Sequence, residues 1–359
     1  MRAQVLEAFN QPYTFRTDFP LPRAPEGYEM LVRVEAASYC HTDAVFACGA
    51  MQQDLPRVGS HEFAGVVIAM GDKAERFGKA KGITLYQLVG VPGRAFSCCG
   101  ECAECTDNGG DEPGQVARVP EASMRPVDVA PLMCAGVTVW NALETAGVDV
   151  TASDLQNGAH GGGDGKRKSI AILGAGGGLG HLGVQFAAKL GWHVLAVDTT
   201  PAMGMLKEVI EGLGEDGQNV TPVDALKETV ENVKRRVFGE ASPGREGEKG
   251  CDASLILPES QAAFDFGMAI IRNHGTCVCV SFPKDGWRFK PGDLVFRHIK
   301  LLGVLTGRNH QLQAMVDFAA KNGVRAKIRT YPLERLNDLV DDYHRGVGGK
   351  LVVDMTMQP

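Results

Sequence analysis

One stretch in the second half of the chain restricts the fold more than any other. It reads SIAILGAGGGLGHLGVQFAAKLGWHVLAVD and covers residues 169–198. An apolar run leads into glycines, a segment with helical spacing follows, and a second apolar run ends in an acid. This alternation is typical of βαβ units on a parallel sheet. We therefore expect a parallel-sheet domain to begin near residue 169.

The glycines of this stretch also indicate a ligand. Gly177, Gly178 and Gly180, with Leu179 between them, would let the backbone turn tightly and approach a pyrophosphate at the positive end of the following helix. Asp198, 21 residues after Gly177, would accept hydrogen bonds from an adenosine ribose. An acid there disfavours a 2′-phosphate, so the pattern predicts NAD in preference to NADP. The alternative is a tight strand-to-helix turn that binds nothing.

The first third of the chain has a different pattern of apolar residues. The 359 residues of the whole chain exceed what one hydrophobic core usually fills, so we expect two domains. The segments EMLVRVEAASY and EFAGVVIAMG in the first third have the composition of short strands bounded by Gly and Pro. This part is expected to be all-β. The Gly-rich segments 156–168 and 239–250 are expected to be surface insertions.

Three widely spaced residues form the ligand set of a catalytic zinc. Cys40 lies in YCHTD, His61 follows 21 residues later in GSHEFAG, and Cys134 follows 73 residues after that in APLMCAGVTVW. Two thiolates and an imidazole leave one position of a tetrahedral zinc open for water or a substrate oxygen. Each residue alone would more often be an ordinary core residue. The prediction therefore depends on the three coming together.

Charge and composition exclude several classes of partner. A net charge of −6 and a pI near 5.9 argue against binding to nucleic acid or to an anionic membrane. No run approaches the roughly 18 apolar residues of a membrane span, and the N-terminus lacks the pattern of a signal sequence. We expect a cytoplasmic protein whose ten cysteines are thiols or metal ligands.

Five motifs occur in the order found in a known enzyme family. They are CHTD at 40–43, GSHE at 59–62, CAGVTVW at 134–140, GGLGHLGVQ at 177–185 and GGKLVVDM at 348–355. The chain resembles the zinc-dependent alcohol dehydrogenases of the medium-chain dehydrogenase/reductase superfamily, nearest the yeast-type branch. The resemblance implies an α/β protein with a GroES-like β-rich catalytic domain and a Rossmann NAD-binding domain with a doubly wound parallel sheet. The implied limits are 1–145, 146–306 and a return to the catalytic domain over 307–359.

The same resemblance assigns roles around the metal and the cofactor. Besides the three zinc ligands, Glu62 matches an acid that can approach the metal, and Asp43 matches the partner of the ligand histidine. Thr42 matches the hydroxyl that takes the substrate proton. His41 and Lys350 match contacts to the cofactor phosphates. Lys350 replaces the arginine usual in the family. Its ammonium group would contact the phosphate as a single point charge, without the paired hydrogen bonds of a guanidinium.

Two departures from the family pattern qualify this picture. Cys99, Cys102 and Cys105 match three of the four ligands of a structural zinc, but the segment TDNGGDEPG that follows contains no fourth cysteine. A closed structural site requires four ligands, so about one zinc per chain is expected. Cys48 occupies the position where yeast-type and liver-type members carry the histidine that ends a proton relay. We expect Cys48 not to bind the metal.

The resulting prediction is an enzyme that transfers a hydride between an alcohol or carbonyl substrate and NAD(H), with one catalytic zinc. The segment LLGVLTG, residues 301–307, resembles the strand through which members of this family pair across a two-fold axis, so the chain is expected to form a homodimer or homotetramer. Two alternatives stay open. A zinc-free double-bond reductase of the same superfamily should lack the Cys40, His61 and Cys134 set. A catalytically silent family member could act as a binding protein.

Overall fold

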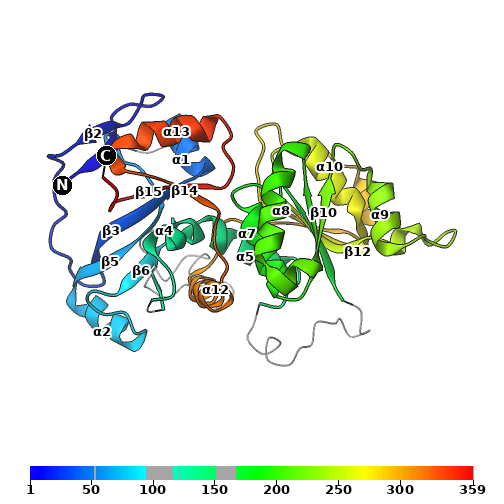
Figure 1. The fold of residues 1–359 in the computed structure, drawn as a ribbon, viewed down its shortest axis with the longest axis horizontal. Helices are drawn as coiled ribbons and strands as arrows, with labels where there is room; N and C mark the ends of the chain where they lie inside the picture. The colour runs from blue at the N-terminus through cyan, green and yellow to red at the C-terminus, as the bar shows by residue number, and fades with distance from the viewer. Residues whose placement is uncertain (52–53, 94–115, 121, 151–166, 359) are drawn as a thin grey trace. The chain divides into compact units, whose positions relative to one another are not determined.

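The chain forms two compact units. In the computed structural model, which describes residues 1–51, 54–93, 116–120, 122–150 and 167–358, one unit consists of Met1–Val137 with Arg308–Pro359 and the other of Thr138–Gly307 (Figure 1). Unit 1 therefore combines the two ends of the chain. The domain limits implied by the resemblance, 1–145, 146–306 and 307–359, stay a prediction.

Unit 1 is built on two sheets. The larger has the strand order β14-β15-β3-β5-β6-β7, and its neighbouring strands are antiparallel except for β14 and β15. The smaller has the order β2-β1-β4 and is antiparallel. The strands are β1 (Ala3–Leu6), β2 (Thr14–Arg16), β3 (Met30–Tyr39), β4 (Arg57–Val58), β5 (Glu62–Met70), β6 (Leu88–Val91), β7 (Ala117–Arg118), β14 (Ile328–Tyr331) and β15 (Lys350–Asp354).

Strand β15, the last along the described residues, lies inside the larger sheet. Strand β15 pairs with β14 on one side and β3 on the other, so that Val352 faces Ser38. The helices and 3₁₀ turns of this unit are α1 (His41–Ala47), α2 (Asp72–Ala80), α4 (Pro126–Val129), η2 (Ala130–Met133), α12 (Asn309–Asn322), η6 (Leu333–Arg335) and α13 (Leu336–His344). Helix α5 (Ala135–Thr145) contains the boundary with unit 2.

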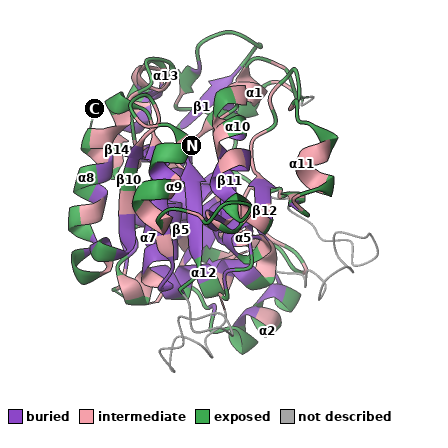
Figure 2. Ribbon diagram, turned by 90° about the vertical axis from the view of Figure 1, so that its right-hand side faces the viewer, coloured by how far each residue is buried: buried purple, intermediate pink, exposed green. Residues whose placement is uncertain are grey.

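Unit 2 has a six-stranded parallel sheet with the order β10-β9-β8-β11-β12-β13. The order reverses at β8, as in a doubly wound fold. All five residues of β8 are buried, and Figure 2 shows strands of this sheet in the purple of buried residues, as expected of a parallel sheet covered on both faces. The strands are β8 (Ser169–Leu173), β9 (His193–Asp198), β10 (Val220–Asp224), β11 (Cys251–Ile256), β12 (Ile271–Cys279) and β13 (Lys300–Gly303).

The helices of unit 2 alternate with these strands. They are α7 (Gly180–Lys189), α8 (Met203–Gly212), α9 (Val230–Phe238), α10 (Gln261–Ile270) and α11 (Pro291–Val295). The β-rich unit and the doubly wound unit confirm the predicted fold class. The segment 239–250 is mostly exposed, as expected of an insertion, whereas most of 156–168 lies outside the described residues. Among the described residues, no single helix is long and apolar enough to cross a membrane; one bent pair, Pro126–Met133 with Ala135–Thr145, reaches that length and composition only in combination.

Candidate metal centre and cofactor loop

The side chains of Cys40, His61 and Cys134 come together in unit 1. Cys40 follows the end of β3, His61 precedes β5, and Cys134 lies between η2 and α5. Their ligand atoms all lie within 4.8 Å of one another, and Cys40 Sγ is 3.4 Å from His61 Nε2. Ligands of one tetrahedral zinc are about 3.5–3.8 Å apart, given the usual Zn–S and Zn–N lengths. The spacing therefore suits a single zinc ion.

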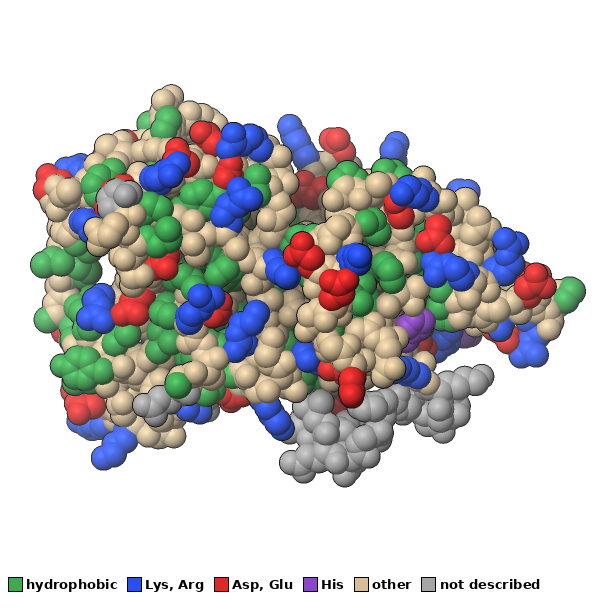
Figure 3. Space-filling model, in the orientation of Figure 1, with side chains coloured by type: hydrophobic (Ala, Val, Ile, Leu, Met, Phe, Trp, Pro, Cys, Tyr) green, Lys and Arg blue, Asp and Glu red, His purple; other side chains and the backbone are tan. Residues whose placement is uncertain are grey.

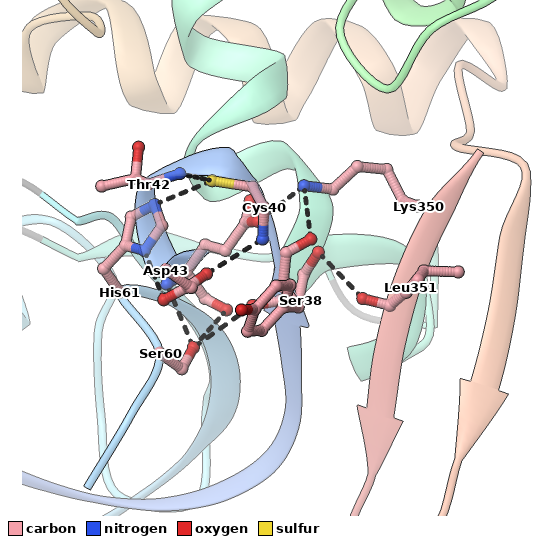
Figure 4. A network of polar contacts seen from close by, with 10 residues as sticks. Ser38, Cys40, Thr42, Asp43, Ser60, His61, Lys350 and Leu351 are labelled. Atoms are coloured by element: carbon pink, nitrogen blue, oxygen red, sulfur yellow. Dashed lines mark hydrogen bonds and ion pairs between the residues drawn. The ribbon is translucent and has the colours of Figure 1, made fainter. Parts of the chain in front are cut away.

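The start of α1 fixes the position of Cys40. Cys40 is the N-cap of this helix, and its backbone N–H donates to Asp43 Oδ2 at 2.9 Å. Its Sγ accepts a hydrogen bond from the backbone N–H of Thr42 at 3.3 Å. This reciprocal arrangement is a capping box with a thiol in the place of the usual hydroxyl. Local helix geometry thus points the sulfur toward His61 (Figure 4).

Asp43 also orients the imidazole of His61. Its Oδ1 lies 2.9 Å from Nδ1, which leaves Nε2 directed at Cys40. A carboxylate on the second nitrogen is the usual partner of a metal-binding histidine. Burial would lower the pKa of His61, but its hydrogen bonds to Asp43 and Cys40 outweigh burial and raise that pKa to about 11. Contacts that favour a proton on this ring would equally favour a bound cation in its place.

The hydrogen bond between the two thiols shifts their pKa values in opposite directions. The hydrogen bond from Cys134 holds the pKa of Cys40 well below its usual value, and the same bond raises the pKa of Cys134. Zinc binds thiolates, so it would displace the proton that the pair shares. Two sulfur atoms and one imidazole nitrogen form a donor set that fits zinc.

A buried ion pair adjoins these ligands. Lys350 Nζ lies 2.6 Å from Glu62 Oε1, and the side chains of Lys350 and Glu62 are 3% and 0% exposed. Glu62 Oε2 has no hydrogen-bond partner, and a Glu62 oxygen lies within 4.8 Å of the ligand atoms of Cys40 and His61. Burial raises the pKa of Glu62 to about 7. Glu62 therefore lies close enough to Cys40 and His61 to approach a metal held by them.

The contact between Lys350 and Glu62 was not predicted from the sequence. The two residues are 288 positions apart, and the resemblance assigns Lys350 to a cofactor phosphate instead. A signal was present in the sequence, because Lys350 begins an otherwise apolar strand, KLVVD. A lysine in a buried strand requires an acidic partner.

Unit 2 brings the glycine loop and Asp198 into contact. The loop joins β8 to α7, and the backbone N–H of Gly176 donates to Asp198 Oδ2 at 2.8 Å. A Cβ at Gly180 would lie 2.0 Å from the carbonyl oxygen of Gly174, so no side chain fits there. Gly174 itself has a φ of +77°. Gly177, Gly178 and Leu179 lie in the same loop, whereas Gly174 and Gly176 were not singled out from the sequence.

Comparisons with known proteins decide the family. Residues 26–121 match the model of the alcohol dehydrogenase GroES-like domain, and residues 178–321 match that of the zinc-binding dehydrogenases. An alcohol dehydrogenase of Geobacillus stearothermophilus is 28% identical over 381 aligned residues that cover 99% of each chain. This chain belongs to the zinc-binding medium-chain alcohol dehydrogenases. It is therefore an oxidoreductase that acts on alcohols, as predicted.

Two further comparisons agree with this placement. Alcohol dehydrogenase 1 of Emericella nidulans is 29% identical, with 98% of this chain and 97% of the relative covered. The crystal structure of the alcohol dehydrogenase from Aeropyrum pernix has a TM-score of 0.74 at 23% identity and covers 99% of this chain and 100% of that one, which shows the shared fold. That the chain lies nearest the yeast-type branch of this family stays a prediction.

The other predicted site residues of this alcohol dehydrogenase lie around α1 or outside the described chain. Cys48 ends α1, is exposed, and donates from Sγ to the carbonyl oxygen of Val45 at 3.3 Å. Among the described residues, the metal-ligand clusters do not include Cys48. His41 Nδ1 lies 3.1 Å from the hydroxyl of Tyr343. Cys99, Cys102 and Cys105 lie outside the described residues.

Proposed function

We propose that this alcohol dehydrogenase uses one zinc and NAD to interconvert an alcohol and its carbonyl product. The observation that carries the proposal is the cluster of Cys40, His61 and Cys134, with Asp43 on the second nitrogen of His61. The match to zinc-binding dehydrogenases supports it. A zinc-free double-bond reductase would not need this ligand set. The turnover of alcohols distinguishes an active enzyme from a catalytically silent binding protein that keeps the same ligands.

Zinc, when bound, would act as a Lewis acid on the substrate oxygen, and NAD would accept a hydrogen with two electrons from the substrate carbon. The chain supplies the remaining functions. Cys40, His61 and Cys134 would hold the metal, and Asp43 would keep the imidazole in the required tautomer. The Thr42 hydroxyl would take the alcohol proton and pass it on toward solvent.

Unit 2 would hold the cofactor. In our proposal the backbone at Gly177, Gly178, Leu179 and Gly180 lies against the pyrophosphate, at the positive end of α7. The carboxylate of Asp198 accepts hydrogen bonds from the adenosine ribose and repels a 2′-phosphate. His41 and Lys350 contribute positive or polar contacts to the phosphates. For Lys350 this contact competes with the one to Glu62.

Two measurements on the purified enzyme test the proposal. Elemental analysis after mild chelation should find about one zinc per chain, because one ligand set is complete and the other lacks its fourth cysteine. NAD reduction should occur with at least part of a panel of primary, secondary and aromatic alcohols, and stop when zinc is stripped. Activity that survives complete removal of zinc would favour the zinc-free reductase, and zinc without turnover would favour the binding protein.

A further inference from the structure

Unit 1 contains a cavity of ligand size. It has a volume of about 810 Å³, within the upper part of the range of roughly 300–1,000 Å³ found for small-molecule pockets. Both sheets of the unit contribute to its walls, through residues such as Ala3 of β1, Val58 of β4, Val34 of β3 and Phe63 of β5. Cys40, His61 and Cys134 do not line it. The cavity is therefore separate from the candidate metal centre.

The walls of this cavity are mainly apolar, and some of them reach solvent. Leu21, Ile68 and Val58 line it and are 77%, 39% and 38% exposed. Figure 3 shows hydrophobic side chains at the surface of unit 1, with Lys and Arg side chains among them. Apolar surface left in contact with water is unfavourable, and a contiguous patch of it commonly marks a binding site. An apolar ligand would remove this surface from water.

The charged side chains that line the cavity all have the same sign. They are Arg2, Arg33 and Arg57, and among the described residues no aspartate or glutamate lines it. Arg2 pairs with Glu334 and Arg33 pairs with Glu35, each at 2.8 Å.

Arg57 differs from the other two arginines. Its guanidinium lies over the ring of Phe46, 5.7 Å from the ring centre, and within the described chain no carboxylate pairs with it. An arginine beside an apolar cavity is suited to bind a carboxylate through its planar donor fork. The positive charge and the apolar walls together define the chemistry of an occupant.

We propose that this cavity binds a fatty acid, with the aliphatic chain between the two sheets and the carboxylate at Arg57. A long aliphatic chain suits the size and apolar walls, and an anionic head group suits lining charges that are all positive. A neutral amphiphile would leave Arg57 unused, and a cationic one would be repelled. This site does not depend on the proposed zinc and NAD chemistry.

The test uses the zinc-loaded enzyme and a dansyl-labelled undecanoic acid, whose fluorescence rises in an apolar site. Dodecanoate, dodecanol and dodecyltrimethylammonium then compete for the site below their micellar concentrations. These competitors share one chain length and differ in charge. Dodecanoate should displace the probe at a concentration roughly tenfold lower than dodecanol does, which corresponds to one charge-assisted hydrogen bond. The cation should be the weakest competitor.

Two pairs of variants locate the site. Ile68→Trp places an indole at the partly exposed wall and should weaken probe binding at least tenfold, whereas Leu85→Trp makes the same change at an exposed residue that does not line the cavity. Arg57→Gln should remove the preference for dodecanoate over dodecanol. Its control, Arg76→Gln, changes an exposed arginine outside the cavity. All four variants should keep the kcat and KM of the parent enzyme for alcohols.

Three results would overturn the proposal. The first is equal displacement by dodecanoate and dodecanol. The second is displacement of the probe by NAD or by an alcohol substrate, which would place it at the catalytic site. The third is a change in sedimentation for Ile68→Trp with unchanged probe binding, which would mark the apolar surface as a contact between copies of the chain. Failure of alcohol oxidation would leave the proposal testable, because probe displacement and sedimentation do not depend on turnover.

Discussion

The carboxylate of Asp43 contacts two of the three candidate zinc ligands. One oxygen accepts from the backbone N–H of Cys40 and the other contacts Nδ1 of His61, both at 2.9 Å. Asp43 is only 3% exposed, and its burial raises its pKa. A single buried acid thus sets the helix start that presents the sulfur and the ring orientation that presents the nitrogen.

Thr42 and Cys48 should differ sharply when substituted. We expect Thr42→Val to lower kcat by roughly 10²-fold, the usual scale for loss of a positioned proton-transfer group. Cys48→Ala should change kcat little, because Cys48 is exposed and its thiol already donates to Val45. The measurement is kcat against pH with one good alcohol. A loss for Cys48→Ala as large as that for Thr42→Val would assign the thiol to the proton path.

Lys350→Met tests whether the buried pair with Glu62 supports the fold. Removing one partner of a buried ion pair leaves the other charge without compensation, at a cost of about 3–5 kcal/mol. Denaturant unfolding should show a loss of about this size, and Lys350→Arg, which keeps the charge, should lose less. The further change Glu62→Gln should restore part of the stability in a double-mutant cycle. A higher KM for NAD with unchanged stability would instead assign Lys350 to the cofactor.

Asp198→Asn tests the choice of cofactor. The parent enzyme should prefer NAD over NADP by roughly tenfold or more in kcat/KM, because a carboxylate repels a 2′-phosphate. Asparagine keeps one acceptor oxygen for the N–H of Gly176 or Thr199 but removes the charge. The ratio of kcat/KM for the two cofactors should shift toward NADP in this variant. A parent enzyme that uses NADP equally well would show that Asp198 does not face the ribose.

At the scale of elements, the turn between β8 and α7 is the most constrained connection. Gly180→Ala would place a methyl group 2.0 Å from the carbonyl oxygen of Gly174, so the loop must shift. Gly183→Ala, one turn further along α7, meets Ile172 at 3.4 Å, an ordinary contact. We expect the first variant to lose NAD binding, measured by fluorescence titration, and the second to retain it. Equal affinities would mean that the loop adapts without cost.

Much of this architecture could be predicted because the signals are local. The strand, glycine loop and helix at residues 169–189 follow directly from spacing, and the zinc ligands stand in short recognisable motifs. The contact between Lys350 and Glu62 could not be found this way, since it joins strands 288 positions apart and depends on how β15 enters the sheet. The sequence also could not show that Gly174 is the residue with the positive φ, because any glycine in GAGGG could adopt that conformation.

At the scale of the whole molecule, the prediction of a homodimer rests on the edge strand β13. Strand β13 has β12 as its only neighbour among the described strands. Apolar side chains near it in sequence are exposed, with Leu302, Leu305 and Phe296 at 40%, 76% and 84%. An open apolar edge is suited to pair with a second copy. We therefore expect a homodimer formed through β13.

Sedimentation of the double variant Phe296→Glu/Leu305→Glu checks this prediction. Charges at the edge should shift the enzyme toward monomer, because burying an unpaired carboxylate is costly. Leu226→Glu is the matched control, since Leu226 is 69% exposed and follows β10 at the opposite edge of the sheet. An unchanged sedimentation coefficient for the double variant would exclude this edge as the interface.

The position of β15 has a consequence for how the protein is made. Of the strands that the structure describes, β15 is the last to be synthesised, yet it lies between β14 and β3, and it carries the ammonium group that faces Glu62. The nascent chain therefore cannot complete the sheet or pair that acid until β15 has been synthesised. A stop codon at position 350 would delete all of β15. Such a product would expose the unpaired edge of β3, which promotes aggregation. We expect cellular quality control to degrade it as a misfolded chain.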